Sequence, residues 1–163
     1  MLTVVIAAVV AFLADRFSKI LILKEVFGLT EPLADKFGET VPLIDGVFHL
    51  TYTGNTGMAF GMLAGNKTLL VTLCLVILAL IVFFLVKYKP ENNLAKISIG
   101  MIIGGAVGNV IDRLAYGFVI DFLDFCLIDY PVFNIADCCI VIGAILFCVY
   151  IIFFDKKEDK VEQ

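Results

Sequence analysis

Charged and amide side chains occur inside segments of this sequence that are otherwise apolar. Asp15 and Lys19 are four residues apart, a spacing that places them on one face of a helix. Asn109 and Arg113 have the same spacing, with Asp112 between them. Such groups are costly inside a membrane and therefore indicate a functional site by default. For Asp15 and Lys19 a simpler interpretation stays open, in which the ion pair only offsets its own burial. We expect the Lys19 ammonium to reach outward to the membrane surface.

A further polar group, Asn134 with Asp137, matches an ordinary helix start. Asn134 is a good N-cap residue, and Asp137 stands at the third helical position, as in a capping box. At a rise of 1.5 Å per residue, however, all three polar groups arrive at the same level of the membrane, on its outer side. Asp121, in the loop before Asn134, can join them. A solvated helix cap does not need so many polar neighbours, so we expect a site at this level.

Among hydrolytic mechanisms, these residues best support one that uses a pair of carboxyl groups. The sequence holds one histidine, His49, and no HExxH motif, so a zinc hydrolase lacks its ligands. Catalysis by His49 with Cys126 or Cys138 stays open.

Two carboxyl groups in a low-dielectric site share a proton, so the ionised one can deprotonate water while the protonated one activates an amide carbonyl. Asp137 suits the ionised role because a helix N-terminus favours an anion. Spacing leaves its partner open among Asp121, Asp124 and Asp129. This chemistry needs neither a metal nor a cofactor, and we expect neither.

The elements that position these groups are predicted to be membrane helices. Of 163 residues, 61% are hydrophobic and 17% are charged, whereas a soluble domain has about 45–50% and about 25%. The mean hydropathy is +1.04. Four apolar runs approach the length of about 20 residues that crosses a bilayer core. The sequence predicts a mainly α integral membrane protein that forms one membrane domain over residues 1–163, with transmembrane helices at about 2–23, 68–86, 97–111 and 138–154.

Lysine residues cluster in the link between the second and third spans and in the tail after the fourth. The positive-inside rule then places that link and both termini in the cytoplasm. We expect the two longer connections, at about 28–66 and 114–136, to face outward. The lysines are Lys87, Lys89 and Lys96 in the link and Lys156, Lys157 and Lys160 in the tail.

The two outward segments differ in character. Residues 41–53 alternate and are rich in β-branched and aromatic side chains, which predicts a small strand-rich cap within 28–66. The segment 114–136 is an apolar loop suited to the membrane interface.

Other features narrow the packing and the possible partners. Gly100, Gly104 and Gly108 repeat every four residues, which is typical of a close helix-packing seam. The net charge of −4 leaves no basic surface for nucleic acid. The five cysteines lie mostly in apolar runs and lack metal-site spacing, so we expect no disulfide framework.

Five short motifs, in order, make the sequence resemble the lipoprotein signal peptidases, or signal peptidase II. The resemblance extends over nearly the whole chain. Each motif alone is weak, but five in the family order together with four spans are specific. Met58 is the one departure, at a position where a small residue is common in the family. The motifs are DRFSK at 15–19, NTGMAFG at 55–61, GNVIDR at 108–113, VIDF at 119–122 and FNIAD at 133–137.

The resemblance implies an aspartic endopeptidase that cleaves a prolipoprotein before a diacylglyceryl-modified cysteine. It implies four transmembrane helices with a small extracytoplasmic β-cradle, in the cytoplasmic (inner) membrane of a bacterium, with the site at its outer face. Its partners would be the prolipoprotein substrate and membrane lipid, and we expect a monomer. By motif position Asp121 and Asp137 would be catalytic, and Asp112 would orient Arg113. The residues that bind substrate or support the pair would be Asp15, Lys19, Asn55, Gly57, Asn109, Asp112, Arg113 and Asn134.

Two other classes of function compete with this interpretation. Ionisable residues inside a membrane also mark ion and proton paths, so a small multi-pass transporter or binding protein is the main alternative. The polar residues gather at one level, however, and do not form a relay across the bilayer. A structural subunit joined through the glycine seam would leave the polar cluster unexplained.

Overall fold

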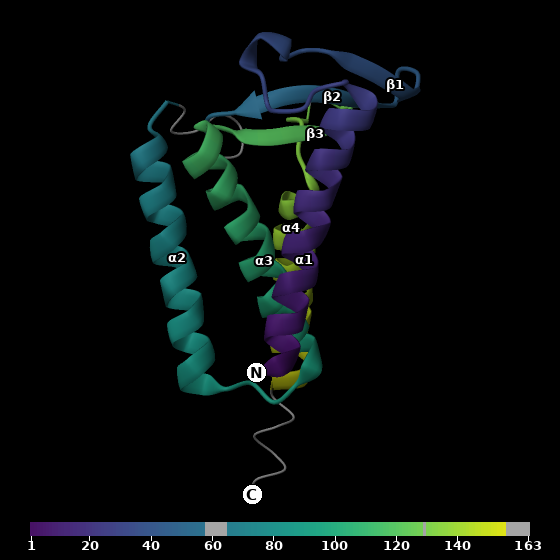
Figure 1. Ribbon diagram of the computed structural model, residues 1–163. Helices are drawn as coiled ribbons and strands as arrows, with labels where there is room; N and C mark the ends of the chain where they lie inside the picture. The colour runs from purple at the N-terminus through teal and green to yellow at the C-terminus, as the bar shows by residue number, and fades with distance from the viewer. Residues whose placement is uncertain (58–64, 129, 156–163) are drawn as a thin grey trace, which may run out of the picture.

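Long helices standing side by side, with a small sheet across one end, make up the protein (Figure 1). The computed structural model describes residues 1–57, 65–128 and 130–155. The N-terminus and the end of the last long helix both lie at the end opposite the sheet (Figure 1). The helices are α1 (Leu2–Leu21), α2 (Lys67–Tyr88), α3 (Asn93–Tyr116) and α4 (Ile135–Tyr150), and the strands are β1 (Thr40–Ile44), β2 (Phe48–Asn55) and β3 (Val119–Phe125). Short helical turns extend α1 over Ile22–Val26 and α4 over Ile151–Asp155, and a third lies at Ala34–Lys36.

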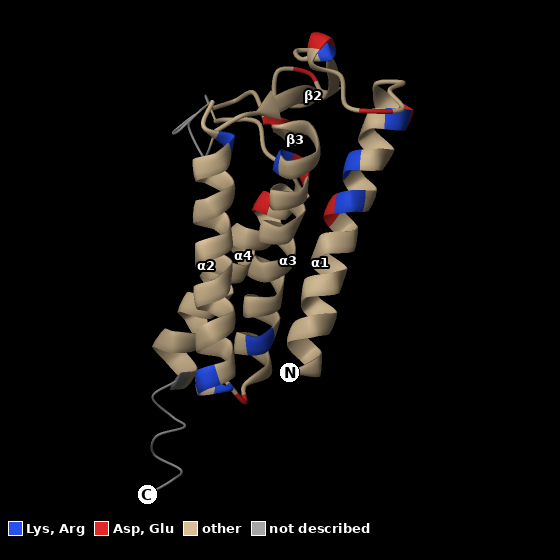
Figure 2. Ribbon diagram, turned by 60° about the vertical axis from the view of Figure 1, so that its left-hand side comes forward, with Lys and Arg blue, Asp and Glu red and all other residues tan. Residues whose placement is uncertain are grey.

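Three of these helices are long and apolar enough to cross a membrane. They are α2 with 22 residues, α3 with 24, and α4 with its extension to Phe154, with 20. Helix α1 has 20 residues but carries Asp15, Arg16 and Lys19 in its second half. Acidic and basic residues are sparse along the helices except in the part of α1 near the sheet and at the ends of the bundle (Figure 2). Large apolar side chains such as Leu2, at 72% exposed, face outward. An apolar outer surface of this kind fits a lipid environment.

Two helices begin earlier than the hydropathy pattern predicts. We expected spans at 97–111 and 138–154, but α3 covers Asn93–Tyr116 and α4 begins at Ile135. The Asn92 side chain caps α3 by accepting a hydrogen bond from the Leu94 amide (2.8 Å). The predicted capping box of Asn134 and Asp137 is present at the start of α4. Polar residues extend both helices beyond the apolar runs. They satisfy the first free backbone amides or lie on a packed face, and a hydropathy profile detects neither feature.

The segment 114–136 is not only the apolar loop that we expected, because it contains strand β3. The strand-rich cap predicted for residues 28–66 is present as β1 and β2, and β3 completes an antiparallel sheet of order β1-β2-β3. In β2–β3 pairing Asn55 stands opposite Val119 and Phe48 opposite Phe125. A cluster of buried side chains packs this sheet against the end of α1: Leu23, Leu29, Leu50, Tyr52, Ile120 and Phe122. The five cysteines are free, as we expected.

The glycine repeat in α3 forms the predicted packing seam. A Cβ atom on Gly100 would lie 2.6 Å from the Val4 carbonyl oxygen of α1, and one on Gly104 would overlap the Ala8 carbonyl oxygen. The glycines therefore allow the backbones of α1 and α3 to touch, a close approach that any side chain would prevent. The seam brings the polar residues of both helices within reach of each other.

We predict that Gly104→Val destabilises the protein by roughly 1–3 kcal/mol, because the added side chain meets backbone atoms that cannot rotate away. Thermal unfolding of the purified protein in detergent measures the effect, with Ala115→Val on the exposed side of α3 as the matched control. Equal melting temperatures for the two variants would contradict the seam.

Candidate active site

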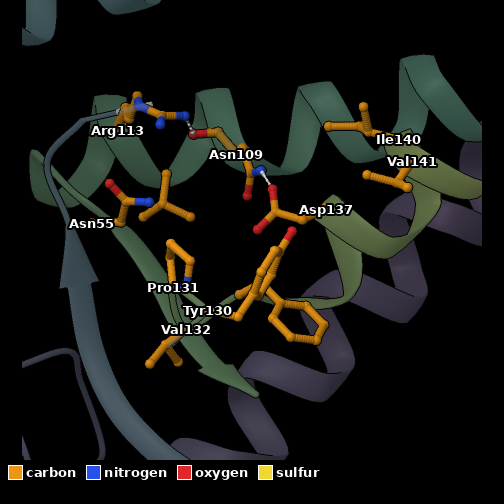
Figure 3. A pocket seen from close by; sticks show the side chains of 11 residues that line it. Asn55, Asn109, Arg113, Tyr130, Pro131, Val132, Asp137, Ile140 and Val141 are labelled. Carbon is orange, nitrogen blue, oxygen red and sulfur yellow. Dashed lines mark hydrogen bonds between the residues drawn. The ribbon is translucent and has the colours of Figure 1, made fainter. Parts of the chain in front are cut away.

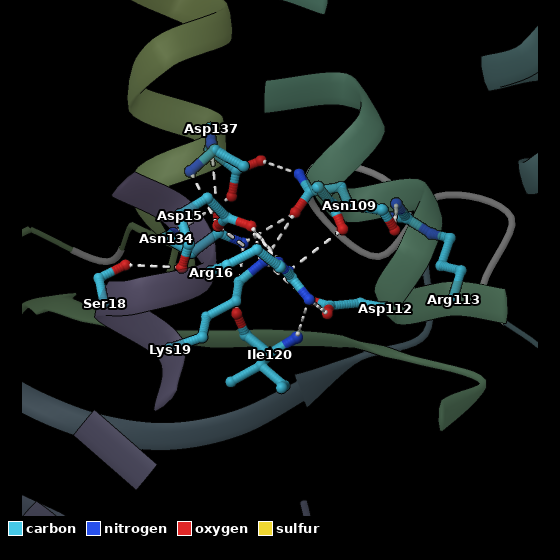
Figure 4. Close-up of polar contacts among 12 residues, drawn as sticks. Asp15, Arg16, Ser18, Lys19, Asn109, Asp112, Arg113, Ile120, Asn134 and Asp137 are labelled. Atoms are coloured by element: carbon cyan, nitrogen blue, oxygen red, sulfur yellow. Dashed lines mark hydrogen bonds and ion pairs between the residues drawn. The ribbon is translucent and has the colours of Figure 1, made fainter. Parts of the chain in front are cut away.

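Four charged side chains from α1 and α3 form an ionic cluster, in which Asp15, Lys19 and Asp112 are buried and Arg16 is half-buried. The Lys19 ammonium lies 2.8 Å from Asp15 Oδ1 and 2.7 Å from Asp112 Oδ2. Arg16 bridges the same two carboxylates, at 2.7 Å from Asp15 Oδ2 and 2.6 Å from Asp112 Oδ1 (Figure 4). Two cations thus balance two anions, which is what the burial of charge in a low-dielectric interior requires.

Two expectations about this cluster are wrong. Lys19 does not reach outward to the membrane surface, because its side chain is only 2% exposed and is held by two carboxylates. Asp112, which we expected to orient Arg113, contacts Arg16, Lys19 and the Ile120 amide. Arg16 was not singled out from the sequence. Two signals could have found it, since it is a third charge in an otherwise apolar helix and it lies in the DRFSK motif.

The ionic cluster extends to α4 through amide groups. Asp15 Oδ1 accepts a hydrogen bond from the Ala136 amide (3.3 Å), and Lys19 donates to Asn109 Oδ1 (3.2 Å). Asn109 Nδ2 then donates to Asp137 Oδ1 (2.8 Å). The position of the Asp137 carboxylate therefore depends on charges in α1, through a continuous chain of hydrogen bonds.

Asn134 connects the two carboxylates that the motifs single out. Its Nδ2 donates to Asp121 Oδ1 (2.5 Å), and its Oδ1 accepts from the Asp137 amide (3.0 Å). The Asn134 amide in turn donates to Asp137 Oδ2 (3.2 Å). The capping box of α4 and the link between Asp121 and Asp137 are thus made by one fully buried side chain.

Strand alternation decides which aspartate of β3 joins Asp137. Residues three apart on a strand point to opposite faces, so Asp121 and Asp124 cannot share a site. Asp121 is 1% exposed and contacts Asn134, whereas Asp124 accepts a hydrogen bond from the Thr51 hydroxyl (2.6 Å). Asp129, the third alternative, lies outside the described residues.

Burial raises the pKa of Asp121 to about 7, and the negative charge of Asp137 acts in the same direction. Hydrogen bonds from Asn134 and Asn55 and the charge of Lys19 lower this pKa and only partly offset the rise. A carboxyl group with a pKa near 7 retains its proton over much of the acidic and neutral range, as a general acid requires.

A cavity of about 190 Å³ opens beside Asp137 (Figure 3). Arg113 lines the cavity, and its Nη2 donates a hydrogen bond to the Gly57 carbonyl oxygen (2.6 Å). The Gly57 amide donates to Asn55 Oδ1 (2.9 Å). Among the described residues, the buried Arg113 Nε has no hydrogen-bond partner. The other lining residues are mostly apolar or aromatic: Val119, Tyr130, Pro131, Val132, Phe133, Ile140 and Val141, with Asn109 beside them.

The structure thus brings together most of the residues that the motifs suggested. Asp15, Lys19, Asn109 and Asp112 lie in or against the ionic cluster. Asn55 and Arg113 line the cavity, and Gly57 is hydrogen-bonded to both. His49 stands opposite Asp124 in the sheet and lies near Cys126, one of the two cysteines left open as its partner, whereas the other, Cys138, belongs to α4. Met58, the departure from the family pattern, lies outside the described residues.

Comparison with known proteins gives consistent matches over most of the chain. A family model described as signal peptidase (SPase) II matches residues 7–153. The lipoprotein signal peptidase of Clostridium acetobutylicum is 35% identical over 158 residues, which cover 95% of this chain and 97% of that protein. That of Halothermothrix orenii is 38% identical over 156 residues, covering 96% and 99%. A solved bacterial membrane enzyme superposes with a TM-score of 0.80 at 31% identity, covering 99% of this chain and 93% of that one.

We predict that Lys19→Met destabilises the protein by about 3–5 kcal/mol, because it leaves two buried carboxylates with one cation. Lys36→Met is the matched control, since the ion pair of Lys36 with Glu39 is exposed on both sides and contributes little. Thermal unfolding in detergent compares the two variants. Similar melting temperatures would mean that the ionic cluster does not stabilise the bundle.

Proposed function

The chain belongs to the signal peptidase II family, and from this premise we propose that Asp121 and Asp137 form its catalytic pair. The protein is an aspartic endopeptidase that removes signal peptides from prolipoproteins. The main support for the proposed pair is that one side chain, Asn134, contacts both residues. It contacts Asp121 through Nδ2 and the Asp137 backbone through Oδ1. Both carboxyl groups are thereby held at one end of α4.

The two carboxyl groups take different roles in peptide hydrolysis. Asp137 stands in the first turn of α4, where the helix dipole and the Asn134 amide favour its ionised form. It removes a proton from water as the water oxygen attacks the scissile carbonyl carbon. Asp121, protonated, donates its proton to the carbonyl oxygen. The resulting gem-diol intermediate collapses when the amide nitrogen receives the proton from Asp137, the C–N bond breaks, and one hydroxyl group returns its proton to Asp121.

The cavity beside Asp137 supports binding of an extended peptide. Its apolar and aromatic lining suits the side chains near the scissile bond, and its polar groups suit the peptide backbone. Arg113 Nε is a buried donor without a partner among the described residues, so it is available for a substrate carbonyl oxygen. Asn55 and Gly57 position this arginine through the Gly57 carbonyl and amide.

We place the protein in the bacterial inner membrane as one domain of four transmembrane helices, with both termini in the cytoplasm. Helix α1 is the fourth span, since its three charges are neutralised by α3 and by each other. Lys87, Lys89 and Lys96 lie at the end of the bundle away from the sheet, which supports a cytoplasmic position for that end. The lysines of the tail, from 156 onward, lie outside the described residues. The sheet and the proposed pair then face outward, and we expect the enzyme to act as a monomer.

A lipid anchor on the substrate follows from this placement. A diacylglyceryl group on the cysteine after the scissile bond holds that bond at the depth of the membrane surface, where Asp121 and Asp137 lie in the proposed orientation. Anchoring raises the local concentration of substrate and orients the attacked carbonyl.

We predict that Asp121→Asn and Asp137→Asn each reduce cleavage of a lipid-modified prolipoprotein by about 10³-fold or more, because Asn keeps the shape but cannot hold or transfer the proton. Purified variants are compared with Asp35→Asn, an exposed aspartate of the cap. Helicity and thermal unfolding establish that each variant is folded. A well-folded variant of either residue with near wild-type turnover would exclude the pair.

We predict that kcat/KM decreases as the pH rises through about 7, because Asp121 then loses the proton that it must donate. In Asn55→Ala this decrease moves to higher pH, since the variant lacks a hydrogen bond that lowers the pKa of Asp121. The profile is measured from about pH 5 to about pH 9, with Asp35→Asn as the control. A flat profile would contradict the protonated role of Asp121.

We predict that an unlipidated precursor is cleaved with a kcat/KM about 10²-fold lower than that of the diacylglyceryl-modified form. Both substrates share one signal sequence and are compared in the same detergent or bilayer. Equal turnover of the two forms would exclude the role of the anchor.

A further inference from the structure

Three metal-binding side chains meet at the end of the sheet, on a part of the molecule that the peptidase mechanism does not use. They are His49 of β2, Asp124 of β3 and Cys126, which follows β3. One donor atom from each side chain lies within 4.8 Å of the others. His49 and Asp124 are half-buried and Cys126 is exposed, so the cluster is open to solvent.

Strand pairing explains why these three side chains share one face. His49 stands directly opposite Asp124 in the antiparallel pair, which places both side chains on the same face. Cys126 is two residues beyond Asp124 and continues the pairing, since its amide donates to the Val47 carbonyl oxygen (3.0 Å). The face is opposite that of Asp121, so the cluster is separate from the proposed catalytic pair.

A neighbouring group holds Asp124 in place. The Thr51 hydroxyl donates to Asp124 Oδ2 (2.6 Å), which leaves Asp124 Oδ1 for another partner. A group that orients a ligand in this way is typical of metal sites in proteins. His49 Nε2 accepts a hydrogen bond from the Gly46 amide (3.2 Å), and a metal ion bound at this nitrogen replaces that hydrogen bond.

A cation fits this cluster better than a catalytic cysteine does. A nucleophilic cysteine is activated by an electropositive neighbour, whereas Cys126 lies beside the carboxylate of Asp124. A carboxylate next to a thiol attracts a divalent cation, and the cation then stabilises the thiolate.

We propose that His49, Asp124 and Cys126 bind one zinc ion at this end of the sheet. Nitrogen, oxygen and sulfur donors together suit zinc, with solvent in the fourth position of a tetrahedral site. Bond lengths of about 2.0–2.3 Å place tetrahedral donors about 3.5 Å apart, so donor atoms that now lie within 4.8 Å of one another must approach by roughly 1 Å to share one ion. The Zn–S bond forms as Cys126 loses its proton to solvent, and one Zn²⁺ then balances one thiolate and one carboxylate beside a neutral imidazole. The ion joins the start of β2 to the end of β3.

The test uses cobalt(II) as a spectroscopic probe, followed by zinc. The purified full-length protein in detergent is freed of metal with a chelator and titrated with CoCl₂. We expect one equivalent to give a thiolate-to-cobalt charge-transfer band that zinc removes. In Cys126→Ser the band is absent, and zinc affinity, measured by competition with a chromophoric chelator, decreases by about 100-fold or more. Thr51→Val removes the hydroxyl that orients Asp124 and that also accepts a hydrogen bond from the exposed Thr40 hydroxyl, and it weakens zinc binding by about 10-fold.

Matched controls separate this site from binding elsewhere. Cys148→Ser removes an exposed cysteine of α4 and should leave the band and the zinc affinity unchanged. Zinc should raise the melting temperature of the wild type but not that of Cys126→Ser or His49→Gln, whose metal-free melting temperatures and circular dichroism establish that they are folded. Absence of the band in the wild type, its persistence in Cys126→Ser, or its loss in Cys148→Ser would overturn the proposal.

Discussion

The structure depends on the neutralisation of four charges inside an apolar bundle. Asp15, Arg16, Lys19 and Asp112 would each be very costly to bury alone, and together they form one compact cluster with two charges of each sign. A displacement of α1 relative to α3 by one helical turn would separate the pairs and leave buried charge unpaired. The cluster therefore specifies how these two helices are aligned.

The close contact between α1 and α3 and the ionic cluster depend on each other. Gly104 and Gly108 let the two backbones touch, and a Cβ on Gly108 would lie 2.5 Å from Asp15 Oδ2. Without these glycines the carboxylate of Asp15 could not lie between the helices, where it meets Lys19 and the Ala136 amide. Small residues and charged residues thus act together at one interface, although in sequence they form two separate patterns.

The residues that position the proposed catalytic pair form structural features that serve other purposes in most proteins. An N-cap normally satisfies the free amides of a helix, but here the Asn134 cap also holds Asp121. An amide side chain between two helices normally serves packing, but Asn109 joins Lys19 to Asp137. Because the same side chains stabilise the bundle and orient the carboxyl groups, stability and chemistry at this site are closely linked. The burial that packs the sheet on the bundle also raises the pKa of Asp121.

By itself the sequence determined those features that depend on neighbours along the chain. These are the apolar helices, the spacing that pairs Asp15 with Lys19, the capping box at Asn134 and the strand-rich cap. Each arises from hydropathy, helical periodicity or a local hydrogen bond, which operate over a few residues. The family motifs also named Asp121, whereas spacing alone left three aspartates open.

Only the tertiary structure decided the features that depend on residues distant in sequence. Strand β3 forms because β2, about 70 residues earlier, satisfies its backbone, so an apolar segment that resembled a loop is part of the sheet. Lys19 is buried because Asp112 neutralises it, and Arg16 joins the cluster for the same reason. His49 and Cys126 are neighbours only through strand pairing. In each case the physical reason is that the free energy of burying a polar group depends on its partner, and that partner is brought near only by folding.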